Sequence, residues 1–143
     1  MRYERQLMLP EIGPEGQAKI KQARVLLVGV GGLGSPIALY LTGAGIGTLG
    51  LMDDDVISTS NLHRQVLYAE EQLEQPKIDE AVKRLHSLNS EVCLKPYPFR
   101  LTNDNAASII SQYDMVIDGC DNFATRYIID DACRAAGIPY LYG

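Results

Sequence analysis

The stretch "RVLLVGVGGLGSPIA", from Arg24 to Ala38, contains an apolar run, a turn with four glycines and the start of a second element. A continuous apolar run of this length is typical of a parallel strand that is buried on both faces. Pro36 stands in the first turn of the following helix, where a backbone N–H is not needed. The stretch therefore predicts a strand over 24–30 that leads through a glycine turn into a helix.

The same alternation of strand and helix continues to the last residue. We expect further strands at 48–55, 92–99, 114–119 and 138–143, and helices at 75–89, 103–113 and 122–137. Alternation of this kind predicts an α/β fold with right-handed crossovers. The expected architecture is a Rossmann-like, doubly wound, mostly parallel sheet with strand order 3-2-1-4-5, preceded by an N-terminal helical segment. Pro96 and Pro98 place the third strand at a sheet edge.

Composition indicates one globular domain over residues 1–143. The chain is 46% hydrophobic and 22% charged, and its formal net charge is −5. A negative protein repels nucleic acid and anionic membranes, so neither is an expected partner. Three widely spaced cysteines and no secretory leader favour a reducing, cytoplasmic location. No apolar run reaches the ~18 to 20 residues of a membrane span.

The glycine turn predicts a nucleotide site. In a sheet of this order, ligands bind beyond the carboxyl ends of the strands, between the first strand and the fourth. Gly29, Gly31, Gly32 and Gly34 form a G-x-G-x-x-G pattern between strand and helix, where phosphate oxygens can approach backbone N–H groups. Asp53, at the end of the second strand, can bind ribose hydroxyls. The expected ligand is an adenosine nucleotide, but the pattern alone does not separate NAD, FAD and ATP.

Four polar stretches favour a triphosphate. They are "RYERQ" (2–6), "SNLHRQ" (60–65), "QPK" (75–77) and "DGCDN" (118–122). Taken singly, each is also compatible with an ordinary solvated surface or a helix cap. Together they bring cations and a carboxylate to the edge of the sheet that carries the glycine turn. A triphosphate undergoing cleavage needs such cations and a carboxylate for Mg²⁺, whereas a dinucleotide does not.

The sequence resembles the ThiF/MoeB family, bacterial relatives of the ubiquitin-activating enzymes. The resemblance spans the whole chain and is carried by six ordered motifs: "RYERQ", "VGVGGLGSP", "LMDDD", "SNLHRQ", "QPK" and "DGCDNFATR". It implies an enzyme that uses ATP and magnesium to adenylylate the C-terminal glycine of a ubiquitin-like sulfur carrier protein with a diglycine tail. Pyrophosphate is released, and the carrier serves thiamine or molybdopterin synthesis.

The resemblance also implies roles for individual residues. The nucleotide-binding set is Gly29, Gly31, Gly32, Gly34, Asp53, Asp55, Asn61, Arg64, Lys77 and Asn122. Arg64 and Lys77 also have catalytic roles, and Asp121 is the catalytic residue associated with Mg²⁺. Arg5 matches an arginine that reaches into the site of the neighbouring protomer, which implies a homodimer.

The zinc-binding motifs of the family are absent from these 143 residues. Longer members contain two C-x-x-C zinc pairs, and Cys93, Cys120 and Cys133 do not have this spacing. The chain is therefore interpreted as the N-terminal, nucleotide-binding part of a longer protein, with zinc expected only in the remainder. Cys120 and Cys133 are expected to be core residues.

Two other functions stay open at this point. An NAD- or FAD-dependent oxidoreductase would use the same nucleotide fold but would leave Arg5, Arg64 and Lys77 without a task. A non-catalytic partner subunit of a ubiquitin-like activating enzyme would be expected to lack Asp121 or the phosphate-binding cations, which this sequence keeps.

Overall fold

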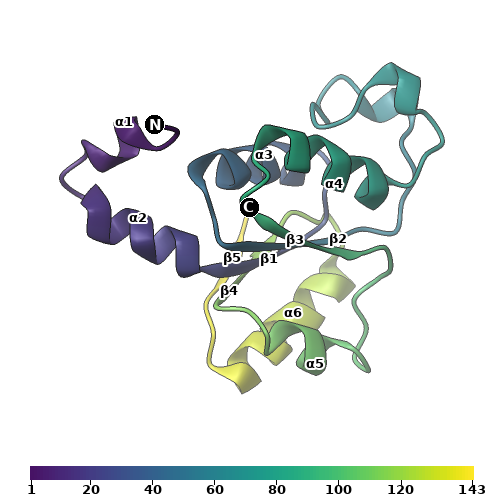
Figure 1. Cartoon of the computed structure of the whole chain (residues 1–143). Helices are drawn as coiled ribbons and strands as arrows, with labels where there is room; N and C mark the ends of the chain where they lie inside the picture. The colour runs from purple at the N-terminus through teal and green to yellow at the C-terminus, as the bar shows by residue number, and fades with distance from the viewer.

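The computed structural model describes residues 1–143 as a three-layer α/β fold (Figure 1). The five strands are all parallel and have the order β3-β2-β1-β4-β5, which confirms the predicted doubly wound sheet. They are β1 (Arg24–Val28), β2 (Thr48–Met52), β3 (Cys93–Tyr97), β4 (Met115–Asp118) and β5 (Tyr140–Tyr142).

Helices cover both faces of this sheet. Helices α3 (Gly34–Ala44) and α4 (Lys77–Leu88) lie on one face, and α5 (Ala106–Ile110) and α6 (Phe123–Ala136) lie on the other (Figure 1). The long connection between β2 and α4 contains two short 3₁₀ helices, Thr59–Asn61 and Glu70–Gln72. None of the helices combines the length and apolar character needed to cross a bilayer.

Side chains of β1 alternate between two hydrophobic cores. Leu27 packs in the core under α3 and α4, and Leu26 packs in the core under α5 and α6. Both side chains are fully buried. Because β1 is covered on both faces, its sequence is a continuous apolar run rather than an alternating one.

All five strands end one to three residues earlier than the sequence predicts, and the ends of β1 and β2 lie at the site. β1 ends at Val28 rather than residue 30, because Gly29 has φ +90° and leaves the extended conformation. β2 ends at Met52 rather than residue 55, because the Asp53 carboxylate accepts the N–H of Asp55 at 2.9 Å. A bond of this kind closes a local turn and competes with the sheet ladder.

The N-terminal segment forms two helices, α1 (Glu4–Leu7) and α2 (Gly13–Gln22). They lie beside the amino ends of the strands, opposite the loops that follow β2 (Figure 1). Gln6 anchors α1 by donating to the carbonyl of Ala44, the last residue of α3, at 3.0 Å. Tyr3 packs against Gly45, and its hydroxyl donates to Glu91 at 2.9 Å. The predicted helical segment is therefore confirmed and is fixed to the C-terminal end of α3.

The backbone turns after β1 and β4 are in close contact. A β-carbon at Gly29 would lie 2.8 Å from the backbone nitrogen of Cys120, and one at Gly34 would overlap the carbonyl oxygen of Gly29. Only residues without a side chain allow this approach. The contact fixes the loop that carries Asp121 against the start of α3.

We therefore predict that the glycines of this turn differ in their contribution to stability. Gly34→Ala should lower the free energy of unfolding by more than about 2 kcal/mol, because the new methyl group meets backbone that is held by two strands. Gly31→Ala should cost less than about 1 kcal/mol, since its β-carbon would meet only the end of the Gln65 side chain, at 3.2 Å. Urea unfolding of both variants measures the difference, and equal losses would contradict it.

Candidate functional site

A cavity of about 440 Å³ lies at the carboxyl ends of β1, β2 and β4, where the strand order reverses. This volume is within the range of ~300 to 1,000 Å³ that small-molecule sites occupy. Ten predicted residues line it: Gly29, Gly31, Gly32, Asp53, Asp55, Asn61, Arg64, Lys77, Asp121 and Asn122. Gly34 lies behind the turn and supports it, and Arg5 is exposed on α1 away from the cavity.

Asp53 holds the glycine turn in place from the neighbouring strand. One carboxylate oxygen accepts the N–H of Val30 at 2.9 Å, and the other accepts the N–H of Asp55. The buried hydroxyl of Tyr68 donates to the Val30 carbonyl at 2.7 Å, so Val30 is fixed on both of its polar groups. Burial, together with Asp53 and Asp55, raises the pKa of Tyr68, which keeps this hydroxyl protonated. Asp53 is therefore structural as well as available to a ligand, since each oxygen has a second lone pair.

Two cations enter the cavity from the β2–α4 connection. Lys77 begins α4, and its side chain is only 4% exposed. Its ammonium lies 3.6 Å from the Asp55 carboxylate, and its backbone N–H donates to the Asp55 carbonyl at 3.0 Å. The Arg64 side chain lies over Gly32, where a β-carbon would be 3.3 Å from its Cδ and Nε. Arg64 therefore lies beside the backbone of the glycine turn, and Lys77 lines the same cavity.

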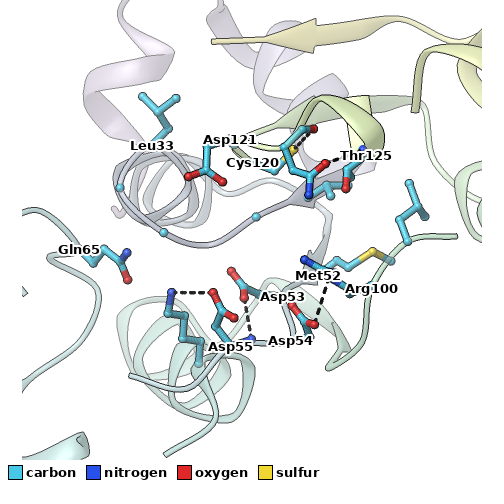
Figure 2. Close-up of a pocket in the computed structure, with 18 of the residues that line it drawn as sticks. Leu33, Met52, Asp53, Asp54, Asp55, Gln65, Arg100, Cys120, Asp121 and Thr125 are labelled. Carbon is cyan, nitrogen blue, oxygen red and sulfur yellow. Dashed lines mark hydrogen bonds and ion pairs between the residues drawn. The ribbon is translucent and has the colours of Figure 1, made fainter. Parts of the chain in front are cut away.

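Asp121 is the cavity carboxylate that has no partner within the chain. It is exposed, and it lies across the glycine turn from Asp53, Asp54 and Asp55 (Figure 2). The next residue, Asn122, caps α6 by accepting the N–H of Thr125 at 3.2 Å. Asn122 thus fixes the helix start that follows Asp121, as the capping interpretation of "DGCDN" predicts.

Gln65 and Arg100 line the cavity although the sequence analysis assigned them no role. Gln65 is buried, points toward the glycine turn, and has no partner for its Oε1 atom (Figure 2). Its position inside the "SNLHRQ" motif was the available signal. Arg100 lies beyond β3 and pairs with Asp54 at 3.3 Å. No local pattern marks it, because the contact joins two loops that are distant in sequence.

A second buried network supports the loop after β4. The Asp118 carboxylate accepts the N–H of Cys120 at 2.8 Å and the hydroxyl of Tyr140 at 2.7 Å. The Nε atom of Arg126 lies 3.4 Å from the same carboxylate, and another Arg126 nitrogen donates to the Cys120 carbonyl at 3.1 Å. These contacts hold residues 119–121 at the edge of the cavity, which Arg126 itself lines.

One expectation about the cysteines is wrong. Cys133 is buried in the core as predicted, but Cys120 is half-buried and lines the cavity. The reason is the contact with Gly29, which turns the chain at 119–120 toward the ligand side of the sheet. Burial and the neighbouring Asp118 raise the pKa of the Cys120 thiol to about 11. The thiol is therefore protonated and weakly nucleophilic at neutral pH.

The arrangement suits the binding of an anionic ligand rather than catalysis by a protein nucleophile. Backbone of the glycine turn, an arginine and a buried lysine surround one space, and an unpaired carboxylate faces it. Cations and N–H groups stabilise phosphate oxygens, and a free carboxylate is suited to a divalent cation that bridges them.

Comparison with known proteins agrees with this chemistry. Residues 3–143 match the ThiF family. The chain is 49% identical over 142 residues to a sulfur carrier protein adenylyltransferase of Thermus thermophilus, covering 99% of this chain and 52% of the relative. It is 53% identical over 141 residues to the adenylyltransferase and sulfurtransferase MOCS3 of Danio rerio, covering 99% of this chain and 31% of the relative. The chain thus spans about half of the length of the first relative and about a third of the second.

A solved structure with ATP has the same fold. The tRNA N6-threonylcarbamoyladenosine dehydratase of E. coli, crystallised in complex with ATP, superposes with a TM-score of 0.87 and 28% sequence identity. The match covers 91% of this chain and 54% of that one.

The raised pKa of Cys120 predicts slow alkylation. At pH 8 the thiolate fraction should be roughly a hundredfold below that of a free cysteine, and labelling by iodoacetamide should keep rising toward pH 11. Mass spectrometry of peptides labelled over a pH series measures the rate, with the exposed Cys93 in the same sample as reference. A rate that levels off below pH 9 would contradict the structure.

Proposed function

Since the chain belongs to the ThiF family, we propose that it is the ATP-binding part of an enzyme that adenylylates the C-terminal glycine of a ubiquitin-like sulfur carrier protein. The observation that carries the proposal is the unpaired Asp121 carboxylate opposite Lys77 and Arg64 around one glycine turn. The name of the Thermus thermophilus relative supports the carrier protein as substrate, and the names of both relatives support adenylyl transfer. We further propose that this carrier protein serves thiamine or molybdopterin synthesis.

The proposed reaction needs no protein nucleophile. A carboxylate oxygen of the carrier's terminal glycine attacks the α-phosphorus of ATP, and the bond from this phosphorus to the oxygen bridging to the β-phosphate breaks. The products are a carrier acyl-adenylate and pyrophosphate. Because both reactants are anions, the enzyme must offset charge on the phosphate oxygens and hold the α-phosphate in line. Charge on the phosphate oxygens can be offset by Lys77, Arg64 and the N–H groups of the glycine turn. Asp53 and Asn61 are suited to binding the rest of the nucleotide.

Asp121 fits a magnesium ion on the chemistry of its surroundings. Mg²⁺ is usually bound by one or two carboxylates together with substrate phosphates. Asp54 and Asp55 are paired with Arg100 and Lys77, and both oxygens of Asp53 accept backbone N–H groups. Asp121 has no such partner. The metal, when bound, would supply further positive charge to the phosphate oxygens. Zinc remains a prediction for a part of the longer protein outside this chain.

We also propose that Arg5 acts on the site of a second protomer. Arg5 has no ion-pair or hydrogen-bond partner in this chain, and Gln6 fixes its helix to the end of α3 that lies opposite the glycine turn. The 11 residues of α3 separate these two ends by about 16 Å. An arginine so placed is suited to a neighbouring site rather than to its own, which supports a homodimer.

The proposal predicts a selective loss of activity in variants of the full-length protein. Lys77→Ala and Asp121→Ala should each lower carrier-dependent ATP–pyrophosphate exchange by at least about 100-fold, or about 2.7 kcal/mol, because each removes charge compensation needed in the transition state. Lys83→Ala is the matched control, since Lys83 is an exposed lysine of the same helix paired with Glu80.

The same assay separates the alternatives. An NAD- or FAD-dependent oxidoreductase would show no carrier-dependent exchange in the wild-type protein and would bind the dinucleotide in preference to ATP in a calorimetric titration. Near-normal exchange in a folded Lys77→Ala or Asp121→Ala variant would remove that residue from the mechanism.

If Arg5 completes the site of a second protomer, two inactive variants should complement each other. In a dimer of full-length Arg5→Ala with full-length Asp121→Ala, one site carries both lesions and the other carries neither. Random exchange makes about half of the dimers mixed, so activity should recover to about a quarter of wild type. If Arg5 acts within its own chain, every site of the mixed dimer carries one lesion and no activity returns. Subunit exchange is verified separately with tagged protomers.

A further inference from the structure

Two successive side chains of the β2–α4 connection lie against two successive glycines of the turn. The Arg64 side chain lies over Gly32, and the Gln65 amide lies against Gly31, where a β-carbon would be 3.2 Å from Nε2. Arg64 is exposed, whereas Gln65 is only 4% exposed. The glycine turn is therefore bordered by a solvated cation and by a buried, neutral amide.

The backbone of Gln65 is fixed on both of its polar groups. Its N–H donates to the Asn61 carbonyl at 2.9 Å, and its carbonyl accepts the N–H of Tyr68 at 3.2 Å. Tyr68 in turn donates its hydroxyl to the Val30 carbonyl in the glycine turn. Because backbone contacts set the position of Gln65 relative to the turn, its side chain is not needed to hold this connection together.

The amide of Gln65 has no partner in the chain. Its Oε1 is buried and unpaired, and its Nε2 forms no hydrogen bond within the chain either. The N–H groups of Gly31, Gly32 and Leu33 in the adjacent turn are also left without an acceptor. Burying an amide without hydrogen bonds costs free energy, and folded proteins accept such costs mainly at functional sites.

We propose that Gln65 binds the phosphate group held at the glycine turn, with Nε2 donating to a phosphate oxygen, an assignment that rests on the proposed binding of a nucleotide. Of the two amide atoms only Nε2 can donate, and it lies on the side of Gly31. A phosphate oxygen accepts hydrogen bonds from several donors, so it can pair with Nε2 and with the free N–H groups of the turn together. A lysine or arginine buried to this degree would have a large desolvation cost, which a neutral donor avoids.

This contact makes Gln65 a specificity residue for phosphorylated nucleotides. Asp53, the residue suited to the ribose, follows β2, whereas Gln65 lies at the glycine turn. Loss of Nε2 should therefore lower the affinity for ATP and leave the affinity for a nucleoside unchanged.

Calorimetric titration of the full-length protein, with ATP and Mg²⁺ and separately with adenosine, tests the contact. Gln65→Met keeps the length of the side chain and removes both polar atoms. We expect the Kd for ATP to rise at least about tenfold and the Kd for adenosine to change less than about twofold, since a hydrogen bond to a charged group is lost only with ATP. Equal losses for the two ligands, or no loss for ATP, would overturn the proposal.

Gln72→Met is the matched control in the same connection. The Oε1 atom of Gln72 accepts the N–H of Ala69 at 2.8 Å, and its Nε2 donates to Glu80 at 2.9 Å. Without nucleotide, Gln72→Met should lower the urea midpoint of unfolding, and its affinity for ATP should stay unchanged. Gln65→Met should leave the midpoint unchanged or raise it, because it replaces an unpaired buried amide. A fall in the midpoint equal to that of Gln72→Met would mean a structural role and would refute the phosphate contact.

Gln65→Glu separates a contact to phosphate from a contact to the neighbouring cations. The new carboxylate would face the phosphate oxygens, so the Kd for ATP should rise further than in Gln65→Met. If Gln65 instead served Arg64 or Lys77, the carboxylate would pair with these cations and ATP would bind better than in Gln65→Met. That second result would overturn the proposal.

The titrations also separate this contact from the proposed function. If the wild-type protein binds NAD in preference to ATP, the adenylylation proposal is wrong, and the comparison is made between NAD and adenosine. The pyrophosphate of NAD would occupy the same glycine turn. A loss of at least about tenfold for NAD in Gln65→Met would then uphold the phosphate contact, and an unchanged Kd would refute it.

Discussion

The close backbone contact between the turn after β1 and the turn after β4 is the constraint on which the site depends. A β-carbon at Gly29 would be 2.8 Å from the Cys120 nitrogen, and one at Gly119 would be 2.8 Å from the Gly29 carbonyl oxygen. This approach joins the two sides of the switch-point crevice, so that Asp121 and the glycine turn face one cavity. Hydrogen bonds of Asp118 also hold the loop after β4, and Asp53, which follows β2, holds the glycine turn.

Most of the carboxylates that line the cavity form contacts within the protein, and one is left available to a ligand. A nearly buried lysine would be costly without a partner, and Asp55 offsets much of that cost while itself remaining mostly exposed. Asp53 and Asp54 are likewise engaged within the chain. Asp121 lines the cavity but forms no ion pair or side-chain hydrogen bond within the chain. Unequal pairing of four neighbouring carboxylates thus distinguishes the residue suited to a metal from those that shape the cavity.

Helix α3 connects the glycine turn to the N-terminal segment. Its first residue belongs to the glycine turn, and its last accepts the hydrogen bond that anchors the N-terminal segment. Its inner face is packed on β1 and β2 through residues such as Ala38, which is fully buried. One rigid helix therefore sets the distance between the glycine turn and Arg5, and its uncharged outer face lies along the whole of that distance.

Local patterns in the sequence determined the strand order, the switch point and most of the cavity. Apolar runs identify β1, β2 and β4, and the glycine spacing identifies the turn, because these signals depend on neighbours in the chain. The resemblance to known motifs singled out Lys77, Arg64 and Asp121 among many charged residues. Only the tertiary structure decided which carboxylates are paired, that Cys120 faces the cavity, that Arg100 joins the rim, and that Arg5 lies at the far end of α3 from its own turn. Those properties arise from contacts between segments far apart in sequence, and their geometry exists only after the sheet has brought the loops together.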